Sequence, residues 1–502
     1  MAKNGDARAS AYLGISFAAP PVGDLRWRDP EPAAARGRLF RATELGPLCA
    51  QTGADAGQYV GEEDCLFLNV WTPPTASPDL RPVLVYIPGG GFVVGGGSSI
   101  AFDGTYLGGR GDVVVVAMNY RLGALGFLRF MADRGTIPGN FGVQDKIRPM
   151  EWVRDNIAAF GGDPDQVTLF GESAGAMSTG LHLFAVPQSV DLFRVAIMES
   201  NDMSVPDAVP ARAAARGAEF VEKICAGTSE AVDCPRSGAW LREIPLDTIL
   251  DAHFDALPFE GMPGLLVTGM AQGMLWAPTV GVAPVAGQAY EGYQPGSSPK
   301  PYVFGINQNE GTFFVPEPAA FSRERYEAAL ECDFGSAAKD EILGYEIDGE
   351  RPYDPDFHEP DAVSGMSAPA QAMAQVITDY GLAAGNVGSA TRALPSMRKA
   401  NLPVRGYYFT EVSNFTYTAL RRCSPETRAV YHTTELLYVF HNLLEKEENG
   451  AFVPAEDVTA AEIRLADALG TLVHYDCWSN IRPAGSPNGQ ACRAATSTGD
   501  DS

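Results

Sequence analysis

Two kinds of apolar pattern alternate along the first 180 residues. Short runs rich in β-branched residues fill positions 81–87, 112–118 and 167–170, and their length is typical of buried strands. Residues 145–160 and 174–184 instead space their apolar side chains as one face of a helix does. Strands and helices that alternate in this way predict a mostly parallel sheet with helices on both faces, so the expected fold class is α/β.

The remainder of the chain continues this pattern without an obvious break. Residues 321–345 and 366–395 are rich in helix-forming patterns, and we expect them to pack around the rim of the sheet. The sequence contains no internal repeat, low-complexity tract or long linker, so residues 1–502 are expected to form a single domain. The last residues, from about 490 to 502, are small and polar and are expected to be a disordered tail.

Composition and charge narrow the classes of partner. Hydrophobic residues make up 45% of the 502 positions, which is enough for a large buried core. The formal net charge of −25 would be repelled by a phosphate backbone or an anionic lipid surface, which argues against nucleic-acid and membrane-surface binding. Prolines interrupt the longest uncharged stretch, 261–290, so we expect no membrane span. No histidine and cysteine cluster has metal-ligand spacing, and we expect neither a metal nor a cofactor.

Residues 171–175 read Gly-Glu-Ser-Ala-Gly, the one G-x-S-x-G pattern in the sequence. The pattern alone is weak, because a chain with this much glycine often contains it by chance. Its context is stronger, since it follows the predicted strand 167–170 directly and opens the predicted helix 174–184. A strand–turn–helix setting presents a nucleophilic serine, so Ser173 is the candidate nucleophile. The alternative is a glycine-rich turn that carries an ordinary serine.

A serine nucleophile creates an oxyanion on the attacked carbonyl, and this oxygen needs preorganised hydrogen-bond donors. Residues 88–92 read Pro-Gly-Gly-Gly-Phe and follow the predicted strand 81–87. Their glycines would allow backbone N–H groups to approach the oxyanion, and the N–H of Ala174 would add a third donor. A flexible loop is the alternative interpretation of this run, and the glycines at 95–97 are expected to be its hinge.

A general base and an acid that orients it complete such a site. The six histidines are His182, His253, His358, His432, His441 and His474. His432 precedes a helix-like segment, 433–440, and is the best candidate by position, whereas His182 lies on the helix after Ser173 and is expected to pack in the core. Glu310 follows the predicted strand 302–306, although it could be an ordinary surface acid. The order Ser173, Glu310, His432 is the chain order of α/β-hydrolase triads.

The sequence as a whole resembles the type-B carboxylesterases, a family that includes the cholinesterases and some fungal lipases. The matching segments are 12–27 (YLGISFAAPPVGDLRW), 63–70 (EDCLFLNV), 119–123 (NYRLG), 139–142 (GNFG), 160–164 (FGGDP), 171–175 (GESAG), 309–312 (NEGT), 432–435 (HTTE), 478–480 (WSN) and 486–488 (SPN). They run from Leu13 to about Asn488, which is nearly the whole chain. The resemblance implies an α/β-hydrolase fold and a serine esterase that acts on small-molecule esters through an acyl-enzyme.

The resemblance also assigns residues to roles, as follows. Ser173 would be the nucleophile, His432 the general base, Glu310 the acid that orients His432, and the N–H groups of Gly90, Gly91 and Ala174 the oxyanion hole. Cys49–Cys65 and Cys225–Cys234 would be disulfides, while the pairing of Cys332, Cys423, Cys477 and Cys492 stays open. Arg26 with Glu63, and Arg121 with Asp163, would be structural ion pairs, and Glu172 would tune the electrostatics of the site.

The sequence departs from the family in ways that bear on the substrate. Pro88 stands where many members carry histidine, a change that affects loop geometry more than chemistry. Residues 51–64 form a short polar loop, where the lipases of the family have a long amphipathic lid and the cholinesterases place a tryptophan. A general esterase is therefore favoured over a lipase or a cholinesterase. The alternative from another class is a non-catalytic, cholinesterase-like adhesion domain.

The expected compartment rests on the cysteines and on the resemblance. Eight cysteines and a family rich in disulfides suggest an extracellular or periplasmic protein, whereas the first residues lack the apolar segment of a secretory signal. Family members usually carry further chain at both ends, so both termini are expected to be short here.

Overall fold

The computed structural model describes most of the chain up to Phe409 and three short segments beyond it. The described residues are 9–35, 37, 39–53, 58–74, 77–131, 135–200, 208–227, 234, 236–254, 276–315, 320–334, 336–347, 349–358, 366–379, 395–409, 433–440, 444–446 and 452–454. The predicted tail at 490–502 and His432 lie outside these residues.

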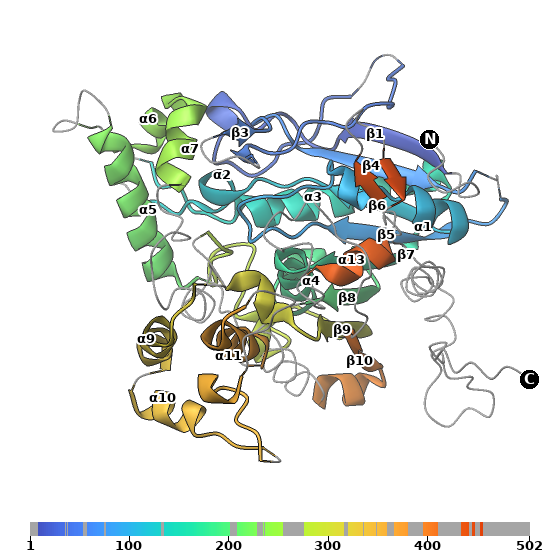
Figure 1. Ribbon diagram of the computed structural model, residues 1–502. Coiled ribbons are helices and arrows are strands. Elements are labelled where there is room, and N and C mark those ends of the chain that lie inside the picture. Colours follow the sequence, from blue (N-terminus) through green and yellow to red (C-terminus); the bar gives the residue numbers. More distant parts are fainter. Residues whose placement is uncertain are drawn as a thin grey trace, which may run out of the picture.

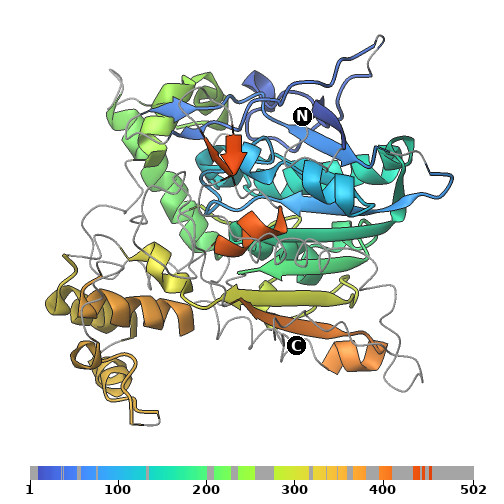
Figure 2. The ribbon, with the colours of Figure 1, turned by 45° about the vertical axis from the view of Figure 1, so that its right-hand side comes forward.

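An eight-stranded sheet forms the centre of the fold (Figures 1 and 2). Its spatial order is β1 (Ser10–Ser16), β4 (Phe67–Thr72), β6 (Val114–Met118), β5 (Arg81–Ile87), β7 (Gly162–Glu172), β8 (Val195–Glu199), β9 (Tyr302–Asn307) and β10 (Val404–Phe409). β1 and β4 pair antiparallel, as do β4 and β6, whereas every pairing from β6 to β10 is parallel. Two small hairpins, β2 (Gln51–Thr52) with β3 (Tyr59–Val60) and β11 (Leu444–Lys446) with β12 (Phe452–Pro454), complete the described strands. The mostly parallel α/β sheet expected from the sequence is confirmed.

Helices cover both faces of this sheet and gather at one end of it. The described helices are α1 (Thr105–Arg110), α2 (Gly123–Phe127), α3 (Phe141–Asn156), α4 (Ala174–Phe184), α5 (Pro210–Ala226), α6 (Gly238–Glu243), α7 (Leu246–Phe254), α9 (Arg323–Phe334), α10 (Ser336–Leu343), α11 (Ala368–Val376) and α13 (Thr434–Val439). In Figure 1, α5 to α7 and α9 to α11 lie to the left of the strands, beside the sheet. The helical segments predicted at 321–345 and 366–395 therefore lie at its rim, as far as they are described.

Alternate side chains of each central strand enter two separate cores, which explains the continuous apolar runs of the sequence. Val83, Val85 and Ile87 of β5 belong to the large core that also contains α3 and α4. Leu84 and Tyr86 point to the other face, where they pack in a smaller core with residues of α1 and α13. Successive strand side chains point to opposite faces, so a strand buried on both sides must be apolar at every position.

Three predicted elements have different bounds in the structure, and the residues involved give the reasons. The helix expected at 145–160 begins earlier, at Phe141, after Asn140 adopts a left-handed φ of 64°, and its last turn, Ile157–Phe160, is a 3-10 helix. The strand expected at 167–170 is part of the longer β7, whose register shifts near its start, where Asp163 accepts a hydrogen bond from the N–H of Asp165. The strand expected at 112–118 starts at Val114, because Asp112 has a left-handed φ of 50°.

No helix within the described ranges is long and apolar enough to span a bilayer.

Candidate active site

Ser173 lies on a sharp turn between β7 and α4. Its backbone has a φ of 56° and a ψ of −127°, a conformation that costs an L-residue about 1–3 kcal/mol. The N–H of Ser173 donates to the carbonyl oxygen of Glu199 at the end of β8 (3.0 Å), and its own carbonyl oxygen accepts from the N–H of Met177 (2.8 Å). A turn held from both sides in a strained conformation presents its side chain beyond the sheet edge, as a nucleophile requires.

The two glycines of this turn allow the backbone of β5 to come close. A Cβ at Gly175 would lie 2.0 Å from the carbonyl oxygen of Ile87, and a Cβ at Gly171 would lie 2.5 Å from Gly175. Both approaches are shorter than any real Cβ contact, so a side chain at either position would push α4 away from the sheet. The G-x-S-x-G pattern is therefore explained by packing as well as by the conformation of Ser173.

The glycine loop after β5 lies directly beside Ser173. A Cβ at Gly89 would lie 3.0 Å from the Cβ of Ser173 and 2.7 Å from the carbonyl oxygen of Glu172. The loop is tightly wound: Gly90, Gly91 and Phe92 all have positive φ, and the carbonyl oxygen of Gly90 accepts from the N–H groups of Val93 and Val94 (3.1 and 3.0 Å). The sequence alternative of a flexible loop does not fit this internal bonding.

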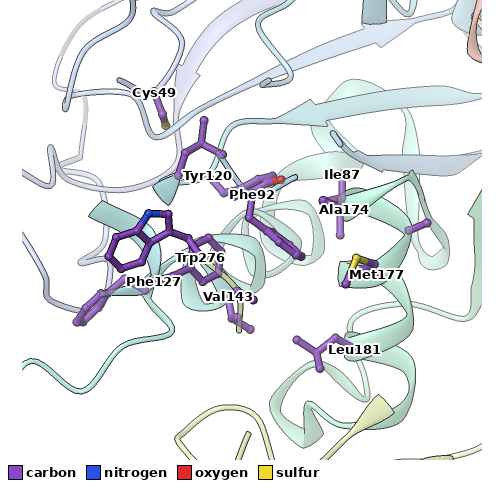
Figure 3. Close-up of a cluster of buried hydrophobic side chains, with 14 of the residues drawn as sticks. Cys49, Ile87, Phe92, Tyr120, Phe127, Val143, Ala174, Met177, Leu181 and Trp276 are labelled. Atoms are coloured by element: carbon purple, nitrogen blue, oxygen red, sulfur yellow. The ribbon is translucent and has the colours of Figure 1, made fainter. Parts of the chain in front are cut away.

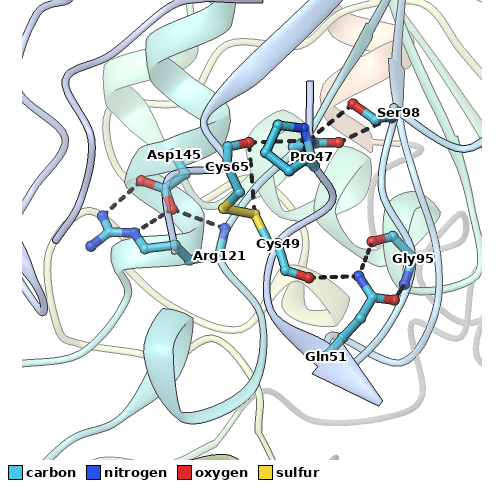
Figure 4. Close-up of a disulfide and its surroundings, with 9 residues drawn as sticks. Pro47, Cys49, Gln51, Cys65, Gly95, Ser98, Arg121 and Asp145 are labelled. Carbon is cyan, nitrogen blue, oxygen red and sulfur yellow. Dashed lines mark hydrogen bonds and ion pairs between the residues drawn. A yellow bond between two sulfur atoms is a disulfide. The ribbon is translucent and has the colours of Figure 1, made fainter. Parts of the chain in front are cut away.

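Side chains from two other segments hold the ends of the loop. The hydroxyl of Tyr120 donates to the carbonyl oxygen of Pro88 (2.9 Å). Gln51 of β2 accepts from the N–H of Gly95 (2.7 Å) and donates to its carbonyl oxygen (2.9 Å), and the same amide nitrogen donates to the carbonyl oxygen of Cys49 (2.8 Å) (Figure 4). Among the described residues, no hydrogen bond takes up the N–H of Gly90 or Gly91.

Glu310 lies at the same edge of the sheet, just after β9. Its carboxylate is fully buried, and one oxygen accepts from the N–H of Asn307 (2.7 Å), so it is no surface acid. The neighbouring N–H of Gly311 donates to the hydroxyl of Thr378 (2.9 Å), which anchors the segment to the end of α11. Parallel strands end at one common edge, so the residues that follow β5, β7, β8 and β9 all meet there.

His432 itself lies outside the described residues, but the helix that starts just after it is described. Glu435 of α13 is buried, and its carboxylate accepts from the hydroxyl of Ser200 (2.9 Å) and from the side-chain amide of Asn307. Ser200 directly follows Glu199, the residue that bonds the backbone of Ser173, while Asn307 bonds Glu310. The first turn of α13 is therefore fixed between the segments that carry Ser173 and Glu310.

Buried acids surround this edge of the sheet, and the sequence patterns predicted no role for two of them, Glu199 and Glu435. Glu172, Glu199, Glu310 and Glu435 all have less than 4% of their surface exposed. Burial raises the pKa of Glu199 well above its usual value, and the neighbouring Glu435 and Glu172 raise it further. The same charges, with burial as the first cause, raise the pKa of Tyr86 and of Tyr407. The signal for Glu199 was available: it is an acid at the end of an otherwise apolar strand.

His182 packs within the core, as expected. It has 2% of its surface exposed, and its Nδ1 lies 3.1 Å from the hydroxyl of Ser189. Burial, followed by the nearby charge of Lys146, lowers the pKa of His182 to about 3, so its imidazole is neutral at pH 7. Its distance along α4 from the turn and its burial separate it from the residues at the sheet edge.

Both implied disulfides are present. Cys49–Cys65 spans 16 residues and lies beside the glycine loop (Figure 4), while Cys225–Cys234 spans nine residues at the end of α5. Cys423, Cys477 and Cys492 lie outside the described residues. Among the ranges that the structure describes, no group of three or more potential metal ligands is found.

One of the two expected ion pairs is confirmed and the other is wrong. Arg26 binds Glu63 through two contacts of 2.6 and 2.5 Å. Arg121 binds Asp145 of α3 in the same bidentate way, with both distances 2.7 Å, rather than the predicted Asp163. Asp145 is fully buried and also accepts from the N–H of Arg121, whereas Asp163 takes its hydrogen bonds from its immediate neighbours.

A cavity among the described residues lies away from this edge of the sheet. It has a volume of about 690 Å³ and is lined by aromatic residues of β1 and of α3 with its following turn, including Tyr12, Trp152 and Phe160. None of the candidate site residues lines this cavity.

Comparisons with known proteins agree with this architecture. The family model described as the carboxylesterase family matches residues 1–491. Acetylcholinesterase of Electrophorus electricus is 31% identical over 519 residues, covering 95% of this chain and 77% of the relative. Para-nitrobenzyl esterase of Bacillus subtilis is 34% identical over 346 residues, covering 66% of this chain and 65% of the relative. A solved structure of PNB esterase has a TM-score of 0.71 at 27% identity and covers 95% of this chain and 87% of that one.

Proposed function

The chain belongs to the carboxylesterase family and is a carboxylic-ester hydrolase, and from that premise we propose that Ser173, His432 and Glu310 form its catalytic triad. The N–H groups of Gly90, Gly91 and Ala174 form the oxyanion hole in this proposal. The observation that carries it is the strained turn at Ser173, with the glycine loop packed against its Cβ and the buried Glu310 at the same sheet edge.

The proposed roles define the reaction. The Ser173 hydroxyl attacks the ester carbonyl while His432 accepts its proton, and the carbonyl oxygen becomes an oxyanion. His432 then gives the proton to the departing alcohol, and the acyl group stays bound to the Ser173 oxygen. Water attacks the acyl-enzyme with His432 again as base. His432 then returns this proton to the Ser173 oxygen as the bond to the acyl carbon breaks, and the carboxylic acid departs. Glu310 orients the imidazole and stabilises its charged form. Each oxyanion donor is worth about 10²–10³ in kcat in comparable sites.

The proposed substrates are small-molecule esters rather than lipid droplets or choline esters. Gln51 and its neighbours in β2 and β3 form a small polar hairpin where the lipases of the family have a long amphipathic lid. No tryptophan occurs between Cys49 and Cys65 to bind a quaternary ammonium group. The two disulfides favour an oxidising compartment, and we place the protein outside the cytoplasm, in the extracellular medium or the periplasm.

Hydrolysis of p-nitrophenyl esters from acetate to palmitate tests this function. Wild type should hydrolyse the shorter esters, and Ser173→Ala should lower kcat/KM by at least about 1,000-fold with an unchanged melting temperature. Ser322→Ala, an exposed serine before α9, is the matched control and should keep full activity. Activity that survives in Ser173→Ala would refute the nucleophile. A folded wild type without any esterase activity would favour the non-catalytic domain, and an optimum at palmitate would favour the lipase.

A further inference from the structure

A lysine lies buried in the core beneath the glycine loop. Lys146 of α3 has no exposed surface, although lysine is almost never fully buried in proteins. Its Nζ lies 3.9 Å from the centre of the Tyr120 ring, 5.1 Å from that of Phe92 and 5.4 Å from that of Phe127. The three rings therefore surround the ammonium group. Aromatic faces attract a cation, and this attraction is strongest where water is excluded.

Two of these rings belong to the glycine loop or bind it. Phe92 is the last residue of the Pro88–Phe92 run, has a left-handed φ of 64° and is fully buried. Tyr120 donates its hydroxyl to the carbonyl oxygen of Pro88 at the other end of the run (2.9 Å). The ammonium group therefore contacts Phe92 at one end of the Pro88–Phe92 run and Tyr120, which binds the other end. Gly90 and Gly91 lie between these two ends.

The surroundings of the rings keep this arrangement rigid. Phe92 packs edge-on against Phe127 with ring centres 5.3 Å apart, and its carbonyl oxygen accepts from the N–H of Gly123 (2.7 Å). Figure 3 shows Phe92, Tyr120 and Phe127 in one buried cluster that also includes Ala174 of α4. The charge of Lys146 also lies near α4, where it is the second cause, after burial, of the lowered pKa of His182.

We propose that Lys146 is a positioning residue for ester hydrolysis: its ammonium group, enclosed by Tyr120, Phe92 and Phe127, holds the Pro88–Phe92 loop in shape. The N–H groups of Gly90 and Gly91 then stay aimed at the oxyanion, and a fixed positive charge lies beneath the site where negative charge develops. This inference rests on the oxyanion-hole role proposed above. It concerns the transition state, since the ground-state ester carries no comparable charge.

Lys146→Met tests the proposal, because methionine keeps an unbranched apolar chain and removes the charge. We expect kcat for p-nitrophenyl esters to fall about 10- to 100-fold, with KM changed less than two-fold. The inhibition constant of a trifluoromethyl ketone, which forms a tetrahedral oxyanion on the nucleophile, should rise by the same factor as kcat/KM falls. Lys223→Met, an exposed lysine near the end of α5, is the matched control and should change neither quantity.

A second variant covers the case in which Lys146→Met does not fold. Tyr120→Phe keeps the ring over the ammonium group and removes the hydroxyl that binds Pro88, so kcat should fall about 3- to 10-fold with KM unchanged.

Hydrogen exchange of the peptide that spans residues 88–96 gives a measurement that needs no activity. It should exchange faster in Lys146→Met, while peptides from β8 should exchange as in the wild type.

The outcomes separate this inference from the proposed function. Wild-type kcat, inhibitor affinity and loop exchange in Lys146→Met would overturn the role of Lys146. A variant in which kcat and the melting temperature both fall and KM rises by a similar factor would also overturn the role of Lys146, because a purely structural lysine would give that result. A wild type without esterase activity would refute the proposed function, and the exchange of residues 88–96 would still decide whether Lys146 positions the loop.

Discussion

Glu199 illustrates at the residue scale how the buried acids should set the pH dependence of stability. Its pKa is raised well above the usual value in the folded state, by burial first and then by Glu435 and Glu172, and returns to about 4.5 on unfolding. The folded state therefore holds a proton that the unfolded state has released. The contribution of Glu199 to the free energy of unfolding is therefore fully present below about pH 4.5. It falls as the pH rises toward the folded pKa, by up to about 1.4 kcal/mol for each pH unit.

Glu199→Gln should remove this dependence, because glutamine resembles the protonated acid. We expect the variant to be more stable than wild type in urea at pH 8 and nearly equal to it at pH 5. Glu219→Gln on the exposed face of α5 provides the matched control, and its effect should be small at both pH values. A variant that loses stability equally at pH 5 and pH 8 would show that Glu199 is charged in the folded protein.

Single residues also show where the sequence was informative and where it was not. Ser173 and Glu310 could be placed because each follows a recognisable strand. Arg121 was assigned the wrong partner, since spacing along the chain cannot distinguish an aspartate on a buried helix face from one in an irregular strand start. The burial of Lys146 depends on neighbours from distant segments, and no local pattern encodes it.

The elements around Ser173 depend on how closely the backbone of α4 can approach β5. Alanine at Gly175 would place a Cβ 2.0 Å from the carbonyl oxygen of Ile87, a clash with backbone that no rotamer can relieve. Gly175→Ala should therefore lower the free energy of unfolding by about 3 kcal/mol or more, and esterase activity should fall with it. Urea unfolding and the p-nitrophenyl assay measure the two effects.

Gly227→Ala is the matched control for this prediction. Gly227 follows α5, and a Cβ there would meet its nearest atom, the carbonyl oxygen of Ile224, at 3.6 Å, an ordinary contact. Its stability should stay within about 1 kcal/mol of the wild type. A Gly175→Ala protein as stable as Gly227→Ala would mean that α4 can move from β5 without cost, and the packing account of the G-x-S-x-G motif would be wrong.

The elements whose bounds the sequence predicted well are those with both a clear period and a clear stop. The observed bounds of β5 and α4 equal the predicted ones, because Pro88 follows β5, the Gly171–Ser173 turn precedes α4 and Pro187 follows soon after its end. β7 was predicted too short, since its first residues are polar and its ladder is irregular there, so the pattern of alternating burial breaks although Gly162 still pairs with Arg81. The strand order could not be predicted, because strands that pair in the sheet, such as β8 and β9, lie far apart along the chain.

At the scale of the whole molecule, the two disulfides stabilise different parts of the fold: Cys49–Cys65 lies beside the glycine loop, and Cys225–Cys234 lies at the end of α5. Cys49–Cys65 closes a 16-residue separation, and removing it should cost about 3 kcal/mol of stability, while the nine-residue separation of Cys225–Cys234 should be worth roughly 2.5–3 kcal/mol. The former also bears on catalysis, because Gln51 binds both the carbonyl oxygen of Cys49 and the backbone of Gly95 at the end of the glycine loop.

The double variants Cys49→Ala/Cys65→Ala and Cys225→Ala/Cys234→Ala are therefore a matched pair. Both should unfold at lower urea concentrations than the wild type. We expect kcat to fall several-fold in the first, since Gln51 loses the fixed carbonyl that orients it and Gly95 moves, and to stay near the wild-type value in the second. Equal kcat values in both variants, under conditions where each is fully folded, would show that the loop keeps its shape without the disulfide. Tyr120, which binds Pro88, and Lys146 would then account for the rigidity of the loop.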